Sequence, residues 1–336
     1  MKVFYNPTEQ DYAPKHSFFN GAMVPYPDVP GRTQNILEAI GPDPRFQVEP
    51  PPAMNPQIVS SVHGEEYLEA LQDVCQRLSA EEEFFPFLSR PWPLLLRSPY
   101  PRIRMGYYAV DGSTPLLSNS FTTSLGASAT ALAGAEAILS GAGMVYAMPR
   151  PPGHHAGRES FAGYCITNHS ALAAQLLSQA GPVAILDVDY HHGNGTQDIF
   201  YEREDVLYIS IHCRPEEAYP YIAGSYHETG YGPGLGRNIN MPLSSGTRWV
   251  DYQEPLADAL ERIQRFNPEA VVLSAGFDTL ADDPIGTFRL TTDDFTPMGK
   301  MISQLGKPLL VVQEGGYHVP SLGACVLGLF NGLGLT

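Results

Sequence analysis

Three residues with ligand-forming side chains occupy alternate positions, at Asp187, Asp189 and His191. They close an apolar run, residues 183–188, that has the length and composition of a buried strand. Alternate side chains of a strand point to the same face, so the three lie together if the extended backbone continues. Isolated buried carboxylates are costly, and a tight turn follows at residues 193–195. The pattern predicts a metal site at a strand end, in which two of the three residues hold the ion.

Three further predicted strands also run into polar residues and glycine. Residues 144–147 lead to Arg150, His154 and His155, residues 270–274 lead to Asp278, and residues 309–312 lead to Glu314 and Tyr317. Ligands of parallel α/β sheets bind beyond the carboxyl ends of the strands. A single polar strand end is ordinary, but four that together supply these side chains indicate one functional site.

Two carboxylates and one imidazole, from Asp189, His191 and Asp278, make a mixed oxygen and nitrogen ligand set. Zinc is the first expectation for such a set, and Fe(II) and Co(II) also accept it. Three protein ligands leave positions for water and substrate. A metal held in this way polarises a carbonyl and lowers the pKa of water.

The remaining side chains fit acid–base roles around such a metal. His154 and His155 are adjacent, so they cannot both face the ion equally, and we expect them to have distinct pKa values. Tyr317 follows a Gly-Gly turn and is suited to donate to a developing oxyanion. Together these residues predict metal-assisted hydrolysis of an amide.

Strands and helices alternate along the second half of the chain, which predicts an α/β fold with a mostly parallel sheet covered on both faces. Helices are expected at residues 32–40, 65–78, 122–139, 170–178, 196–201, 250–266, 295–305 and 322–329. Residues 1–60 read as mainly irregular, and residues 84–108 as a Pro-rich loop. We find no repeat or linker and predict a single domain, residues 1–336.

Composition narrows the partners and the compartment. The formal net charge of −16 argues against nucleic acid, which needs a basic surface, and is compatible with a cationic substrate. There is no apolar run of membrane-spanning length, and the first residues lack the pattern of a signal peptide. Four scattered cysteines without a CxxC pair indicate reduced thiols, so we expect a cytoplasmic protein.

Four segments of the chain contain the polar strand ends, at residues 150–156, 187–196, 274–278 and 314–317. They resemble the signature motifs of the histone deacetylase superfamily, and the overall length and spacing are closest to those of the bacterial acetylpolyamine amidohydrolases. The resemblance implies an arginase-like α/β fold and one catalytic Zn²⁺ bound by Asp189, His191 and Asp278. It implies that His154 and His155 are the tandem histidines, the second being general base and then acid, and that Tyr317 polarises the acetyl carbonyl.

The same resemblance gives roles to neighbouring residues. Asp187 matches the carboxylate that orients the first histidine, and Asn194 falls where some relatives have an Asp partner of the second. A structural K⁺ or Na⁺ is implied at one or two sites. Its expected ligands are Asp187, Asp189, His191, Ser210 and Ile211 for the first, and Phe200, Arg203 and Val206 for the second.

Tyr164 and Tyr219 match the aromatic walls of the family's substrate tunnel, with Gly163 allowing close approach of the substrate amide. Ile285 and Gly315 are also expected to contact substrate. Arg32 resembles an arginine of an inner acetate-release channel.

Residues 84–117 lie where acetylpolyamine amidohydrolases carry a loop that narrows the site and helps to form a homodimer. Acidic residues there, such as Asp111, are suited to bind a secondary ammonium, although the position where an acid is expected is occupied by Ser113. Cation recognition must then come from other residues as well.

We therefore predict a zinc-dependent deacetylase of acetylated polyamines or small acetylated diamines. Two alternatives stay open: the same chemistry on acetyl-lysine in proteins, and a catalytically silent binding protein on the same fold.

Overall fold

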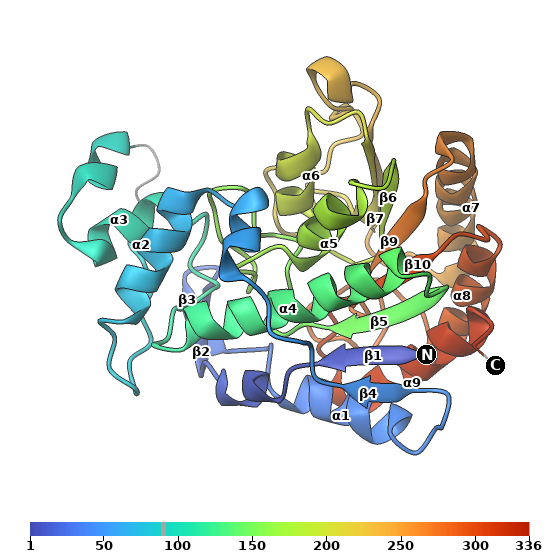
Figure 1. Cartoon of the computed structure of the whole chain (residues 1–336), viewed down its shortest axis with the longest axis horizontal. Helices are drawn as coiled ribbons and strands as arrows, with labels where there is room; N and C mark the ends of the chain where they lie inside the picture. The colour runs from blue at the N-terminus through green and yellow to red at the C-terminus, as the bar shows by residue number, and fades with distance from the viewer. Residues whose placement is uncertain (89–91, 336) are drawn as a thin grey trace.

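A computed structural model describes residues 1–88 and 92–335, and its centre is an eight-stranded sheet in the order β4-β1-β5-β10-β9-β6-β7-β8 (Figure 1). The strands are β1 (Lys2–Tyr5), β4 (Gln47–Glu49), β5 (Met144–Met148), β6 (Val183–Asp187), β7 (Val206–Cys213), β8 (Asn238–Leu243), β9 (Ala270–Ala275) and β10 (Leu309–Gln313). Every pairing within this sheet is parallel. The predicted parallel α/β fold is confirmed.

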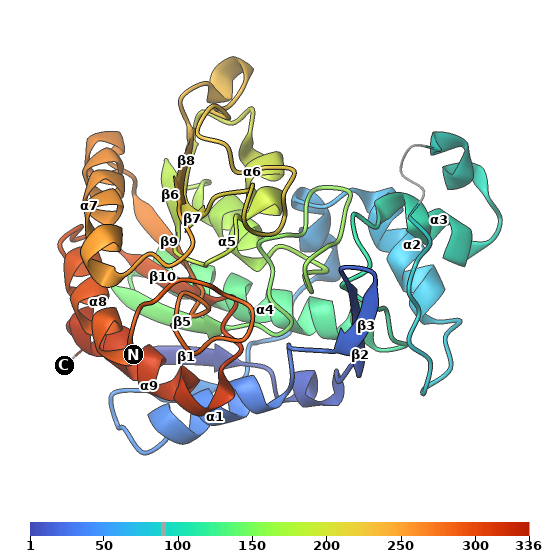
Figure 2. The ribbon, with the colours of Figure 1, turned by 180° about the vertical axis from the view of Figure 1, so that it is seen from behind.

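Helices cover both faces of the sheet, as the near-continuous apolar strands require. One face packs against α4 (Ser120–Leu139) and α5 (His169–Leu177), which lie in front of the sheet in Figure 1. The view from behind shows the opposite layer, formed by α1 (Gly31–Ile40), α7 (Trp249–Phe266), α8 (Phe295–Ser303) and α9 (Val319–Gly332) (Figure 2). Successive strand residues alternate between the layers, so Leu310 packs on the α4 side and Val311 on the α9 side.

Helix α4 approaches the sheet closely because its residues are small. A Cβ built on Gly134 would lie 2.5 Å from Cδ1 of Leu310, so a larger residue there would require the Leu310 side chain to move. The helix begins at Ser120, two residues before the predicted start, and ends at Leu139 as predicted.

The polar strand ends meet because their strands are neighbours. β5, β10, β9 and β6 are consecutive in the sheet, and they are the four strands that the sequence analysis connected to polar residues. Their carboxyl ends point toward α2 (Glu65–Cys75), α3 (Pro101–Tyr108) and the hairpin of β2 (His16–Phe19) and β3 (Ala22–Pro25) (Figure 1). Ser274 of β9 pairs in register with Asp187 of β6.

The structure corrects three expectations. Residues 84–108 are not all loop, because they include the 3₁₀ turn Pro93–Arg97 and helix α3, which starts with Pro101 at its first turn. Residues 89–91 of this segment lie outside the described residues. Residues 1–60 contain the β2–β3 hairpin and β4. Strand β8 was missed because its Asn and Pro residues are typical of loops, and Pro242 is tolerated there because β8 is an edge strand.

Across residues 1–88 and 92–335, no helix combines the length and the apolar character needed to cross a membrane. The four cysteines are buried and free.

A short helix, α6 (Asn194–Phe200), follows the motif after β6 and completes the elements around the site.

His63 gives the fold a pH-dependent stability. Its Nδ1 donates to the carbonyl of Gly157 at 2.9 Å, and its Nε2 accepts the N–H of Asn168 at 2.9 Å. Burial lowers the pKa of His63 to about 4. This pKa lies below the pKa of about 6.5 that a histidine has in the unfolded chain. Neutral His63 therefore contributes fully to the free energy of unfolding above about pH 6.5, and this contribution is lost as the pH falls toward 4.

We expect the slope of unfolding free energy against pH, between pH 7 and pH 5, to be shallower in His63→Gln by up to about 1.4 kcal/mol per unit. Urea unfolding measures it, and His227→Gln, which alters an exposed histidine, is the matched control. An unchanged slope in His63→Gln contradicts this role.

Candidate active site

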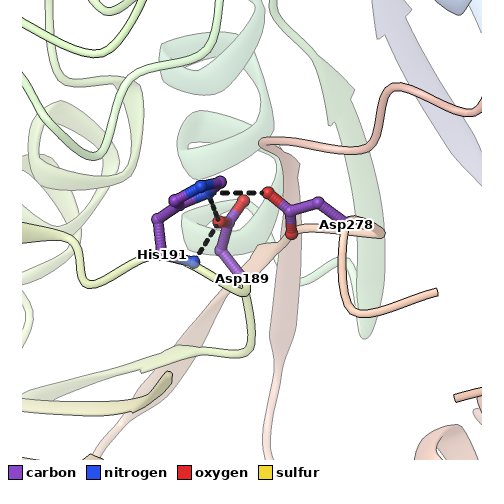
Figure 3. A group of neighbouring side chains, drawn as sticks. All are labelled: Asp189, His191 and Asp278. Carbon is purple, nitrogen blue, oxygen red and sulfur yellow. Dashed lines mark hydrogen bonds and ion pairs between the residues drawn. The ribbon is translucent and has the colours of Figure 1, made fainter. Parts of the chain in front are cut away.

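Asp189, His191 and Asp278 bring one ligand atom each to a common point, all within 4.8 Å of one another (Figure 3). Nδ1 of His191 lies 2.9 Å from Oδ2 of Asp278 and 3.3 Å from Oδ1 of Asp189. Both carboxylates are completely buried, and His191 is 6% exposed. The loops after β6 and β9 carry the three residues, so adjacent strands supply the cluster.

Backbone groups fix the two carboxylates. The N–H of Gly315 donates to Oδ2 of Asp189 at 2.8 Å, and the N–H of Tyr190 donates to Oδ1 of Asp278 at 2.8 Å. A Cβ on Gly315 would lie 2.5 Å from Oδ2 of Asp278 and 2.6 Å from Oδ2 of Asp189. Glycine at 315 therefore allows the chain after β10 to approach both carboxylates.

The electrostatics of this cluster suit a divalent cation. Burial, and then the charge of Asp189, raise the pKa of Asp278 to about 7, because two carboxylates share one dry site. A bound cation removes this repulsion, and two carboxylate oxygens with one imidazole nitrogen match the ligands that zinc and related ions accept. The donor set and its burial thus fit the predicted metal.

The tandem histidines have different partners, although their ring centroids are only 4.0 Å apart. His154 Nδ1 faces Oδ2 of Asp187 at 3.1 Å, whereas His155 Nδ1 faces Oδ1 of Asn194 at 2.8 Å. Burial opposes a charge on His154, but the carboxylates of Asp189 and Asp187 raise its pKa to about 10. Burial, and then the neighbouring His154, lower the pKa of His155 well below its usual value. These contacts favour the charged form of the first ring and the neutral form of the second.

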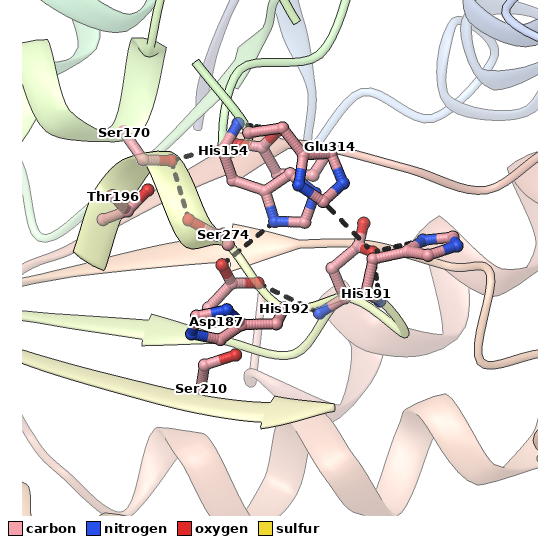
Figure 4. A network of polar contacts seen from close by, with 12 residues as sticks. His154, Ser170, Asp187, His191, His192, Thr196, Ser210, Ser274 and Glu314 are labelled. Atoms are coloured by element: carbon pink, nitrogen blue, oxygen red, sulfur yellow. Dashed lines mark hydrogen bonds and ion pairs between the residues drawn. The ribbon is translucent and has the colours of Figure 1, made fainter. Parts of the chain in front are cut away.

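Asp187 lies outside the metal cluster, although strand alternation alone would place it with Asp189 and His191. The strand ends at Asp187, whose Oδ1 accepts the N–H of Asp189, and its Oδ2 also accepts the Tyr208 hydroxyl at 3.0 Å. Figure 4 shows this carboxylate beneath His154.

Glu314 is a second buried carboxylate in this network, and the sequence analysis gave it no role (Figure 4). Its Oε2 accepts the N–H of Gly153 at 2.7 Å and of His154 at 3.2 Å, and Oε1 accepts the Ser170 hydroxyl. Burial raises the pKa of Glu314 to about 7. Its position at one of the four strand ends that the sequence connects to polar residues was the available signal.

Tyr317 closes the other side of the site. Burial raises the pKa of its hydroxyl well above the usual value, so the hydroxyl stays protonated and can donate. Its backbone N–H donates to Oδ2 of Asp283 at 2.6 Å, an anchoring residue that the sequence analysis missed. The guanidinium of Arg32 lies 4.7 Å from its ring centre. Arg32 is itself held by Asp28 and by the carbonyls of the Glu314–Gly316 turn.

A pocket of about 520 Å³ opens onto these groups. Its lining includes His155, His191, Tyr317, Gly163, Tyr164, Tyr219 and Ile285. The Tyr219 ring lies 4.8 Å from that of His155, and the Tyr164 ring lies 5.7 Å from that of Tyr317. A Cβ on Gly163 would lie 2.3 Å from His155, so a side chain there would block this wall. Gly315, in contrast, lies against the metal cluster rather than in the lining.

Asp111 supports the wall of the pocket. Its carboxylate accepts hydrogen bonds from the Tyr219 hydroxyl, the Gly163 N–H, and the N–H and hydroxyl of Ser113. These four bonds occupy the acceptor positions that a carboxylate offers. Asp111 is therefore better placed to position the pocket wall than to bind a substrate ammonium.

The residues expected to bind monovalent cations lie on and around β7. Ser210 pairs in register with Asp187, and Ile211 follows it in the strand. Phe200, Arg203 and Val206 lie on the turn from α6 into β7, where the Arg203 N–H donates to the carbonyl of Phe200 at 2.9 Å. Cation binding at both places stays a prediction.

The chain belongs to the histone deacetylase family, whose domain, described as "Histone deacetylase domain", matches residues 26–333. Acetylpolyamine amidohydrolase from Mycoplana ramosa is 39% identical over 341 residues, which cover 99% of each chain. Acetylpolyamine amidohydrolase 2 from Pseudomonas aeruginosa is 37% identical, over 99% of this chain and 98% of that one.

A crystal structure of acetylpolyamine aminohydrolase from Burkholderia pseudomallei has the same fold, with a TM-score of 0.95 at 37% identity. The match covers 99% of this chain and 98% of that chain. The resemblance drawn from the sequence motifs is confirmed.

Gly315→Ala tests the metal cluster. We expect the variant to fold but to lose at least about tenfold in affinity for divalent metal, because the added methyl group displaces both carboxylates, Asp189 and Asp278. Metal content by mass spectrometry and circular dichroism measure these two properties. Gly143→Ala, where a Cβ meets nothing within 4 Å, is the control, and native metal affinity in Gly315→Ala contradicts the arrangement.

Proposed function

We propose that the protein is a zinc-dependent deacetylase that hydrolyses acetylated polyamines or small acetylated diamines to acetate and a free amine. The observation that carries this proposal is the convergence on one pocket of a buried Asp-His-Asp cluster, a neutral histidine and a protonated tyrosine. Full-length relatives called acetylpolyamine amidohydrolases support the same reaction class.

Asp189, His191 and Asp278 would hold Zn²⁺, and the bound ion would supply Lewis acidity toward the acetyl carbonyl and a lowered pKa of water. The identity of the metal is part of the proposal. The chain contributes the acid–base groups and the shape of the pocket.

His155 moves the proton. Because its Nδ1–H donates to Asn194, its Nε2 carries the lone pair, and this nitrogen takes a proton from the attacking water. The same proton then passes from Nε2 to the nitrogen of the amine as the carbon–nitrogen bond breaks. Acetate and the amine leave, and His155 returns to its neutral state.

His154 and Tyr317 stabilise negative charge during this reaction. His154, whose pKa the carboxylates of Asp189 and Asp187 raise, places a positive charge beside the place where the water is deprotonated. Tyr317 donates its hydroxyl to the carbonyl oxygen as that oxygen gains charge, and preorganised donors of this kind typically contribute about 10²–10³ in kcat.

The substrate class rests on the pocket and on charge. Aromatic walls at Tyr164 and Tyr219 suit a thin alkyl chain, and the net charge of −16 favours approach of a cationic amine. We infer that acetyl-lysine in proteins is the poorer substrate, since the named full-length relatives act on acetylpolyamines.

Three accompanying features are also proposals. One or two monovalent cations around β7 would hold the loop after β6, with Asp187 facing Ser210 across the two strands as support. The exposed Phe87 and Leu94 of residues 84–117 support the expected homodimer. Four free cysteines support a cytoplasmic location.

The direct test is acetate release from acetylputrescine and from an acetyl-lysine peptide by the zinc-loaded protein. We expect kcat/KM to be at least about tenfold higher for acetylputrescine, a difference of about 1.4 kcal/mol. A clear preference for the peptide overturns the polyamine assignment, and no acetate from either substrate overturns the deacetylase assignment.

A further inference from the structure

Glu217 is the one carboxylate among the described residues that line the catalytic pocket. The other lining groups are aromatic, apolar or uncharged, apart from the site histidines. No role was predicted for Glu217 from the sequence, and recognition of the substrate cation stayed unassigned because Ser113 occupies the position where an acid is expected. The Glu217 carboxylate is therefore the candidate in this wall for binding the cationic group of a substrate.

Hydrogen bonds hold Glu217 at the rim. Its backbone N–H donates to the carbonyl of Arg214 at 2.9 Å, and its Oε2 accepts the N–H of Ser245 at 2.7 Å. The Ser245 hydroxyl donates to Thr287 at 2.8 Å, and Thr287 contacts the hydroxyl of Tyr190 at 2.9 Å. Since Tyr190 directly precedes the metal ligand His191, this chain of contacts fixes the carboxylate relative to the reacting centre.

Glu217 keeps free acceptor capacity, in contrast to Asp111. Oε1 lies 3.5 Å from the Arg214 guanidinium, its one ionic partner among residues 1–88 and 92–335, and both of these side chains are more than a third exposed. Such exposed ion pairs are weak, so an arriving ammonium can compete with Arg214. Arg214 itself is not part of the lining, and its guanidinium donates to Ser244 as well.

Tyr221 lines the same pocket as Glu217 and has an unusual backbone. Its φ is 63°, in the left-handed region that bulky residues rarely adopt. Its ring centre lies 6.3 Å from that of Tyr219, and its side chain is half exposed at the pocket rim. Aromatic faces attract ammonium groups, and strained residues gather at functional sites.

We propose that Glu217 and Tyr221 bind the ammonium group at the far end of the substrate's alkyl chain and so set specificity for acetylated diamines and polyamines. This inference rests on the proposed function. The carboxylate accepts hydrogen bonds from the ammonium, and the Tyr221 ring provides a face for the same charge. A neutral amide of equal length fills the same pocket without these interactions.

Two substrates separate charge recognition from chemistry: acetylputrescine, and N-pentylacetamide, which carries a methyl group in place of the ammonium. In the zinc-loaded enzyme, Glu217→Gln should lower kcat/KM for acetylputrescine about tenfold, mainly by raising KM. A tenfold change corresponds to about 1.4 kcal/mol. Its kcat/KM for N-pentylacetamide should change less than about twofold. Glu216→Gln, the same charge change at an exposed neighbour outside the lining, should leave both values unchanged.

Tyr221→Gly is the second variant, because glycine accepts the positive φ and removes the ring. We expect it to stay folded, as urea unfolding can check, and to lose about threefold in selectivity for acetylputrescine over N-pentylacetamide. Equal losses on both substrates in Glu217→Gln, no loss on either, or an equal effect of Glu216→Gln would overturn the assignment.

Calorimetry distinguishes failure of this inference from failure of the proposed function. Acetylputrescine binding is measured in Tyr317→Phe, with and without Glu217→Gln. Binding weakened about tenfold by Glu217→Gln supports the ammonium site, even if the wild-type enzyme releases no acetate and the proposed reaction is wrong. Unchanged binding overturns the ammonium site, whatever the activity of the wild-type enzyme.

Discussion

The buried pair of carboxylates, Asp189 and Asp278, is the constraint on which the rest of the structure depends. Two negative groups in a dry interior repel each other, and burial alone already favours their neutral forms. The backbone donors of Tyr190 and Gly315 and the imidazole of His191 compensate part of this charge. A divalent cation at the point where the three ligand atoms meet would compensate the rest, so the site is suited to a metal ion.

The parallel sheet makes this arrangement possible. Because β5, β10, β9 and β6 are neighbours, the loops after them meet at one edge and contribute the histidine pair, Tyr317 and the two carboxylates. The two neighbouring histidines differ in the group that their Nδ1 atoms contact, which is the carboxylate of Asp187 for His154 and the neutral amide of Asn194 for His155. The carboxylates of Asp189 and Asp187 raise the pKa of His154, whereas burial and His154 lower that of His155.

Much of this was predictable from the sequence, since strand length, turn residues and ligand types are local signals. The parallel sheet, the triad of Asp189, His191 and Asp278, and the unequal histidines follow from such signals. Strand β8 was not predictable, because Pro242 reads as a loop residue and is acceptable only at a sheet edge. Strand alternation alone does not separate Asp187 from Asp189, because the extended backbone ends between them, and only the family resemblance placed Asp187 beside His154.

Residues whose role depends on distant packing were the hardest to find. Glu217 lies in an irregular segment between β7 and β8, and only contacts through Ser245 and Thr287 place it at the pocket. Asp283 orients Tyr317 from another loop. No spacing rule connects these positions along the chain, so the fold is needed to see them.

Metal reconstitution tests the central claim most directly. Protein freed of metal with a chelator is titrated with Zn²⁺ while bound zinc and acetate release from acetylputrescine are measured together. The account predicts no release without metal and activity that rises with zinc to a plateau at one catalytic equivalent per chain. Turnover by the metal-free chain, or a plateau that does not follow occupancy of the Asp189, His191 and Asp278 cluster, would contradict it.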